Sequence, residues 1–116
     1  MSTTQLTATI PTTRTDGTAL AATDIASITF QKIPAATPTG PEVVLQTNTE
    51  ASGGLAPADL TFTDSSAAVG DVYTCFVTDS EGNVGVLSNT FENQAQSPPP
   101  TLAPPSGPSL AGVFTP

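Results

Sequence analysis

The sequence contains no histidine and no tryptophan, a single cysteine and only two basic side chains among its 116 residues. Without histidine there is no imidazole general base, no Ser-His-Asp triad and no histidine metal ligand. The lone Cys75 excludes an intrachain disulfide, and one thiol cannot build a thiolate metal site. These absences remove the commonest sets of catalytic and metal-binding residues. We therefore expect no enzymatic activity and no cofactor.

The charge balance restricts the class of partner. Arg14 and Lys32 are the only cations against ten carboxylates, which gives a formal net charge of −8. Nucleic acids and anionic membrane surfaces are bound through clusters of cations, which this chain cannot form. No stretch approaches the ~20 apolar residues of a membrane span, and the first residues lack the basic and apolar regions of a secretory signal. We expect a protein partner, no nucleic acid, no membrane, and synthesis in a cytoplasm.

What the sequence does contain is a series of short segments in which apolar and polar residues alternate. This period of two is typical of strands that bury one face. Turn residues separate the segments, and no helical period is present apart from a brief turn around Ala56–Asp59. The pattern predicts an all-β sandwich of about six to seven strands within residues 1–92. The expected strands are Gln5–Ile10, Ile25–Lys32, Glu42–Gln46, Leu60–Thr63, the first part of Asp71–Asn83, and Val84–Phe91.

The stretch Asp71–Asn83, DVYTCFVTDSEGN, contains the only tyrosine and the only cysteine. Tyr73, Cys75 and Val77 share one face, and we predict that they are structural core residues. Tyr73 also stands two residues before Cys75, the spacing of a tyrosine corner, in which the hydroxyl bonds to backbone upstream. The turn Asp79–Asn83 alternates oxygen ligands as some calcium loops do. It lacks the twelve-residue loop with its terminal Glu, which favours a plain hairpin turn.

Two blocks of the sequence carry a resemblance to a known family. Leu6–Lys32 has a strand that ends in proline, then a Thr-Asp-Gly loop and a second strand. It is similar to the first half of fibronectin type III-like domains of bacterial and phage proteins. Asp71–Asn89 resembles the Tyr-x-Cys-x-Val, Asp-x-x-Gly-Asn and Ser-Asn end of immunoglobulin-like and fibronectin type III-like domains. The resemblance implies an immunoglobulin-like sandwich, and it says less about function because this fold hosts many roles.

The start of the chain departs from this family. The family has a strand ahead of the one at Leu6, and Met1–Thr4 is too short to supply it. A strand edge left unpaired is normally covered or blunted. We expect the edge at Leu6–Ile10 to be covered, either by a partner or by this chain's own tail, unless Met1–Thr4 with a bulge suffices.

Residues 93–116 differ sharply in composition, because seven of the twelve prolines fall in the last nineteen residues. Proline interrupts helices and β-ladders, so we expect an extended polyproline II arm rather than a strand. A small apolar cluster follows the prolines and reads as an anchor for a partner, with a disordered linker as the alternative. The predicted partner-binding residues are Pro98, Pro99, Pro100, Leu102, Pro104, Pro105, Leu110, Val113 and Phe114.

These features together predict a non-enzymatic phage structural protein. The specific expectation is a small capsid decoration protein on the virion surface, which docks on the major capsid protein or on neighbouring copies through its arm and sheet edge. One alternative is a tail, baseplate or host-adhesion module whose loops contact glycan. The absence of Trp and the single Tyr count against it, because sugar rings stack on aromatic side chains. The other alternative is an accessory domain of a larger enzyme.

Overall fold

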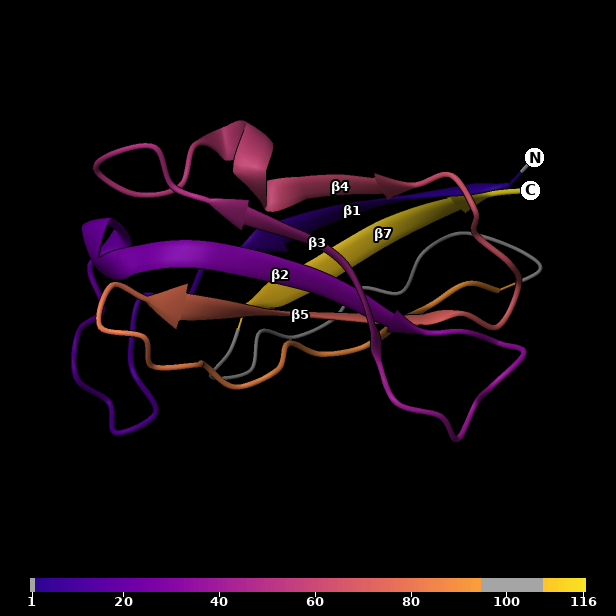
Figure 1. Cartoon of the computed structure of the whole chain (residues 1–116), viewed down its shortest axis with the longest axis horizontal. Helices are drawn as coiled ribbons and strands as arrows, with labels where there is room; N and C mark the ends of the chain where they lie inside the picture. Colours follow the sequence, from indigo (N-terminus) through magenta and orange to yellow (C-terminus); the bar gives the residue numbers. More distant parts are fainter. Residues whose placement is uncertain (1, 95–107) are drawn as a thin grey trace.

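The computed structural model describes residues 2–94 and 108–116, which form two antiparallel sheets packed as a sandwich (Figure 1). One sheet has three strands in the order β4–β1–β7: Thr61–Asp64, Thr3–Thr9 and Ser109–Thr115. The other has four strands in the order β3–β2–β5–β6: Val43–Thr49, Ile25–Ile33, Val72–Asp79 and Phe91–Glu92. Within the described residues the helical segments are two 3-10 turns, η1 (Ala22–Asp24) and η2 (Pro57–Leu60). The predicted all-β sandwich is confirmed.

The alternating segments form strands close to where the sequence predicts them. β1 begins at Thr3 instead of Gln5, and it ends ahead of Pro11, which has no N–H to donate to a ladder. β2 and β5 are long and lie side by side in the middle of their sheet. β5 buries every second residue, and its inward side chains include Tyr73, Cys75 and Val77, as predicted.

The core lies between the sheets, with side chains from both. Its members are apolar residues of five strands: Leu6, Ala8, Ile25, Ile28, Phe30, Tyr73, Cys75, Val77, Phe91 and Leu110. The rings of Phe30 and Phe62, from opposite sheets, stack with centroids 5.8 Å apart. Tyr73 packs against Phe91 with centroids 6.4 Å apart. Aromatic pairs at such distances add stability beyond their buried area, which helps a core that contains no Trp.

The expectation of a long last strand at Val84–Phe91 is wrong. Only Phe91–Glu92 forms β6, and Val84 makes an isolated bridge to Thr78. The segment still follows β5, because the Ser88 N–H donates to the Cys75 carbonyl at 2.8 Å. However, the Cys75 N–H donates to the Ser88 hydroxyl, at 2.9 Å, instead of to a backbone carbonyl. A side chain therefore replaces one rung, and the ladder is interrupted.

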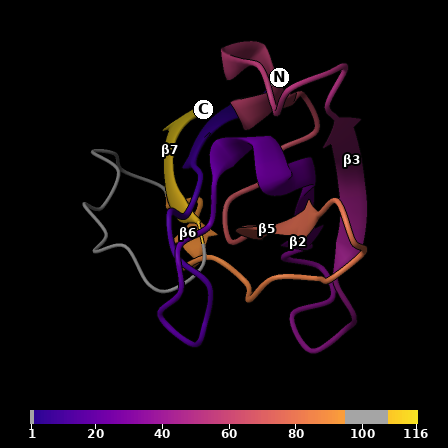
Figure 2. The ribbon, with the colours of Figure 1, turned by 90° about the vertical axis from the view of Figure 1, so that its left-hand side faces the viewer.

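The expectation for the chain end also needs correction. Residues 93–116 were predicted as an arm, yet Ser109–Thr115 form β7 inside the sandwich. Proline prevents a ladder only where it stands, and none occurs between Pro108 and Pro116. Figure 1 shows β7 alongside β1, with both chain ends at the same side of the sandwich. In Figure 2 β7 lies on the side of the sandwich opposite β3.

Candidate functional site

The C-terminal strand covers the edge of β1 along its whole length. The two strands pair antiparallel in continuous register from Thr3 opposite Thr115 to Thr9 opposite Ser109. The predicted cover over this edge is thus the chain's own tail. β1 is paired on both sides, with β4 and β7, so its backbone no longer offers a template for another strand.

The apolar cluster of this tail is divided between the core and the surface. Leu110 and Phe114 are buried, with 1% and 4% of their surface exposed, whereas Val113 is 52% exposed. Leu110 and Phe114 were predicted to contact a partner, but here they pack within their own domain. The reason is the alternation of SLAGVFT, in which Leu110, Gly112 and Phe114 share the inward face. Val113 remains on the outside.

Two features fix the position of β7. A Cβ on Gly112 would come within 2.9 Å of the Phe91 ring, so only glycine fits here without displacing the ring. Asn89 holds the start of the strand with two hydrogen bonds. Its Oδ1 accepts from the Leu110 N–H, and its Nδ2 donates to the Leu110 carbonyl, both at 3.0 Å. A shift of β7 by one residue would break both bonds and turn Leu110 outward.

The remaining predicted partner-binding residues are not tested. They lie outside the described residues, within the segment 95–107: Pro98, Pro99, Pro100, Leu102, Pro104 and Pro105.

A buried polar cluster lies at the end of the sandwich near the start of β5. The Tyr73 hydroxyl donates to Asp64 Oδ2 at 2.7 Å, and Lys32 Nζ donates to the same oxygen at 2.8 Å. Lys32 also bonds Asp71 Oδ2 at 3.2 Å. The upstream acceptor expected for Tyr73 was backbone, and the structure shows the Asp64 carboxylate instead. Asp71 further accepts from the N–H groups of Ala35 and Ala68.

The pKa shifts of Lys32 and Asp64 favour the charged forms of both side chains. Burial lowers the pKa of Lys32, but the hydrogen bonds that Lys32 donates to Asp64 and Asp71 outweigh this effect, and the net pKa is raised. Burial raises the pKa of Asp64, but bonds from Lys32, Tyr73 and Ser66 lower it below its usual range. Burial, assisted by Asp64, raises the pKa of the Tyr73 phenol. Lys32 and Asp64 therefore keep their charges through the bond between them, and with Tyr73 they connect β2, β4 and β5.

Asn93 and Thr4 complete the cluster, and sequence reasoning missed both. Thr4 Oγ1 donates to Asn93 Oδ1 at 2.8 Å. Asn93 Nδ2 donates to the Tyr73 hydroxyl at 3.2 Å and to the Ala68 carbonyl at 3.0 Å. Both residues are fully buried. Asn93 thereby connects β1, β5 and the loop after β4, but nothing in its sequence context distinguishes it from an exposed asparagine.

The opposite end of the sandwich holds the turn Asp79–Asn83. The Asp79 carboxylate accepts hydrogen bonds from the N–H groups of Glu81 and Asn83, as in an Asx turn. Gly82 supplies the positive φ of 89° that the turn requires. This confirms the predicted hairpin turn. Arg14 Nη1 bonds Asp79 Oδ2 at 2.9 Å, and this bond, then Asn83, holds the pKa of Asp79 well below its usual range.

A hollow of about 300 Å³ lies beside this turn. Arg14 and Asp79 contribute to its wall, and most of the rest is apolar, including Leu20, Val84 and Pro108. Among the described residues that line the hollow, Asp79 is the only carboxylate, and it is paired with Arg14. The described wall therefore offers mainly apolar contact.

An exposed apolar segment adjoins the hollow. Val84, Val86 and Leu87 are 68%, 46% and 42% exposed, and none of the described strands β1–β7 contains them. Val43 and Val44, on the edge strand β3, are 47% and 60% exposed. Single exposed apolar side chains are ordinary, but here three lie within four consecutive residues, and we call this apolar segment the 84–87 patch.

Cys75 is buried, with none of its surface exposed. Burial raises the pKa of its thiol to about 11. Thiolates are the reactive form of cysteine, and at neutral pH almost none is present here. Cys75 acts as a small core residue, as predicted.

Over residues 2–94 and 108–116, no three Asp, Glu or Cys side chains gather as possible metal ligands. In the same ranges no helix is long and apolar enough to cross a membrane. In comparisons with protein-family models, with curated proteins and with solved structures, the chain has no significant match.

Proposed function

We propose that this chain is a non-enzymatic structural protein of a phage particle, a small decoration protein that sits on the capsid. In this proposal it is an immunoglobulin-like module that binds the major capsid protein through its surface. Its role is passive, and the contacts of many copies on a symmetric lattice add up.

The order of the strands supports the immunoglobulin-like part of the proposal. Immunoglobulin-type sandwiches place strands A, B and E, with D in constant domains, in one sheet and C, F and G, with C′ added in variable domains, in the other. Here β1 and β4 occupy the positions of B and E, and β3, β2, β5 and β6 those of C′, C, F and G. The position of strand A is filled by β7, from the other end of the chain. This agrees with the resemblance of Leu6–Lys32 and Asp71–Asn89 to that family.

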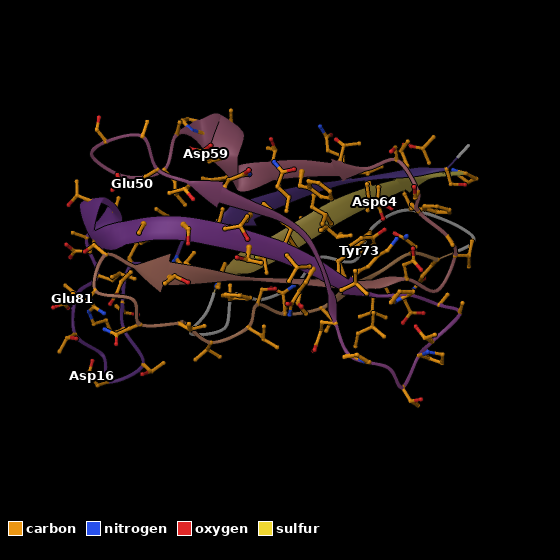
Figure 3. All side chains as sticks on the ribbon, viewed as in Figure 1. Asp16, Glu50, Asp59, Asp64, Tyr73 and Glu81 are labelled. Carbon is orange, nitrogen blue, oxygen red and sulfur yellow. The ribbon has the colours of Figure 1, made fainter. Side chains whose placement is uncertain are left out.

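The observation that carries the functional proposal is what the fold leaves at its surface. Both cations are engaged, Lys32 with Asp64 and Asp71 and Arg14 with Asp79. Seven carboxylates have no cationic side chain in contact, and Figure 3 shows four of them at loops and turns: Asp16, Glu50, Asp59 and Glu81. An acidic surface with the 84–87 patch suits a protein partner that offers apolar side chains rimmed by cations.

The abundance of the chain in purified particles tests this proposal. We expect mass spectrometry of virions from the source to find copies in a fixed, high ratio to the major capsid protein. A dozen or fewer copies per particle would indicate a tail or baseplate component instead. Absence of the chain from the particles would end the virion proposal.

A matched pair of variants tests the surface involved. Val84→Asp together with Val86→Asp introduces charge into the 84–87 patch, and we expect it to lower occupancy on particles at least tenfold. Val43→Asp together with Val44→Asp adds the same two carboxylates at similarly exposed valines on β3, and we expect occupancy to stay near that of the wild type. Equal loss in both variants would show that added negative charge, not the patch, weakens binding.

A further inference from the structure

β7 is the last strand in the sequence, but in the fold it lies beside the first strand, β1. Among the described strands, β7 lies at the edge of its sheet and pairs with β1. Residues 95–107 connect it to the rest of the domain. Its contacts with β1, Phe91 and Asn89 are made by β7 itself and would be the same if another copy of the chain supplied the strand.

The connection has length to spare. Asn93 lies at the far end of β7, because Thr4 bonds Asn93 at 2.8 Å and pairs with Phe114. The chain must therefore return to Ser109, five residues or ~17 Å along a strand. Fourteen peptide steps separate Gln94 from Pro108. A chain of that length spans at most ~46 Å, more than twice the distance required.

The groove that β7 fills is selective. It buries Leu110 and Phe114, and its contact with the Phe91 ring admits only glycine at position 112. Asn89 adds two hydrogen bonds to the Leu110 backbone, which fix the register of the strand. Backbone pairing with pockets for alternate side chains is how sheets bind an added strand with specificity. The segment of sequence that meets all these requirements is SLAGVFT, which every copy of the chain carries.

We propose that β7 is exchangeable between copies: Ser109–Thr115 of one chain binds the β1 groove of a second copy. The bonds made are identical in the closed monomer and in the exchanged form. The balance is then set by protein concentration against the effective concentration of the tethered strand, which is of the order of mM for short linkers. Dilute protein is monomeric, and crowded copies become linked through their strands. This inference does not depend on the virion proposal.

Engineered disulfides in the full chain test it. Gln5 and Val113 are directly paired and both exposed. Gln5→Cys and Val113→Cys are made in separate chains, mixed in urea, refolded at about 0.01 and about 1 mM, and then oxidised. A disulfide that joins positions 5 and 113 is then necessarily between chains. We expect it at the high concentration, at least fivefold above the low one. Cys75 is buried in the refolded protein, so we expect it to form no disulfide in this experiment.

Two controls make the result decisive. Thr7→Cys replaces Gln5→Cys as an exposed position two residues out of register, since Thr7 pairs with Ala111. Random collision would link both pairs equally, and that result would overturn the proposal. In the double variant with both Gln5→Cys and Val113→Cys, a disulfide formed within one chain fixes β7 to its own β1. This variant should elute as a monomer at both concentrations. Dimers of the locked variant, or no link between positions 5 and 113 at about 1 mM, would also overturn it.

Discussion

The two ends of the sandwich each contain one of the chain's two cations, but the surroundings differ. Lys32 is 12% exposed and bonds two buried carboxylates, whereas Arg14 is 34% exposed and bonds one. Figure 3 shows Asp64 and Tyr73 at the Lys32 end and Asp16 and Glu81 at the opposite end. Removing a buried charge leaves its partners uncompensated, while water replaces an exposed one. The ion pairs of Lys32 therefore contribute more to the free energy of unfolding than the ion pair of Arg14.

The largest expected effect comes from Lys32→Met. It leaves Asp64 and Asp71 buried without a cation, which costs about 3–5 kcal/mol of unfolding free energy. Urea denaturation followed by circular dichroism at neutral pH measures it. The loss should shrink as the pH falls, because a protonated Asp64 no longer needs the ammonium group.

A companion variant separates charge from packing. Lys32→Met combined with Asp64→Asn and Asp71→Asn removes the three charges together, and we expect it to recover part of the stability lost in the single variant. If the triple variant is less stable than Lys32→Met, the carboxylates matter mainly through their bonds to backbone, and the comparison of the two ends changes.

Tyr73→Phe has a smaller expected effect. It removes one donor to Asp64 and one acceptor from Asn93, and each of these keeps another partner. We expect a loss of about 1 kcal/mol, the typical net value of a hydrogen bond. In the wild type, the raised pKa of Tyr73 predicts that tyrosinate absorbance does not appear near pH ~10 while the fold persists. Normal titration of the phenol would mean that the cluster opens to solvent.

The smallest effect is expected at the other end. Asp79 and Asp64 have folded-state pKa values below the unfolded value of about 3.9, so the stability they contribute is present above that pH. It is lost as the pH falls through the folded values. Arg14→Met removes the hydrogen bond that contributes most to the lowered pKa of Asp79, and it leaves the contacts of Asp64 unchanged. We expect a neutral-pH loss well below that of Lys32→Met and an acid-unfolding midpoint shifted to higher pH. An equal loss in both variants would contradict the comparison.

Most of the fold could be predicted from sequence, because apolar and polar residues alternate clearly in strands such as β1 and β5. The alternation of Tyr73, Cys75 and Val77 predicted their burial directly. β7 alternates just as clearly in Leu110, Gly112 and Phe114, but the preceding prolines suggested an arm. The local pattern of SLAGVFT was the better guide than the composition around it, since proline acts only at its own position.

The polar cluster could not be predicted in the same way. Lys32, Asp64 and Asp71 look like ordinary strand-end and turn residues, and they meet only because three separate elements converge. Asn93 is 89 residues from its partner Thr4. Contacts of this kind are set by tertiary packing, and no local pattern encodes them. The hollow beside Arg14 likewise results from the meeting of loops that are distant in sequence.

The pairing of the first strand with the last has a consequence for the order of folding. Even their closest paired residues, Thr9 and Ser109, are one hundred positions apart. Closing such a loop costs about 4 kcal/mol in the length-dependent part of the chain entropy. The β2–β3 and β2–β5 pairs join nearer segments, so we expect that sheet to form first and β7 to dock last. Each newly made molecule then passes through a stage in which the edge of β1 is bare.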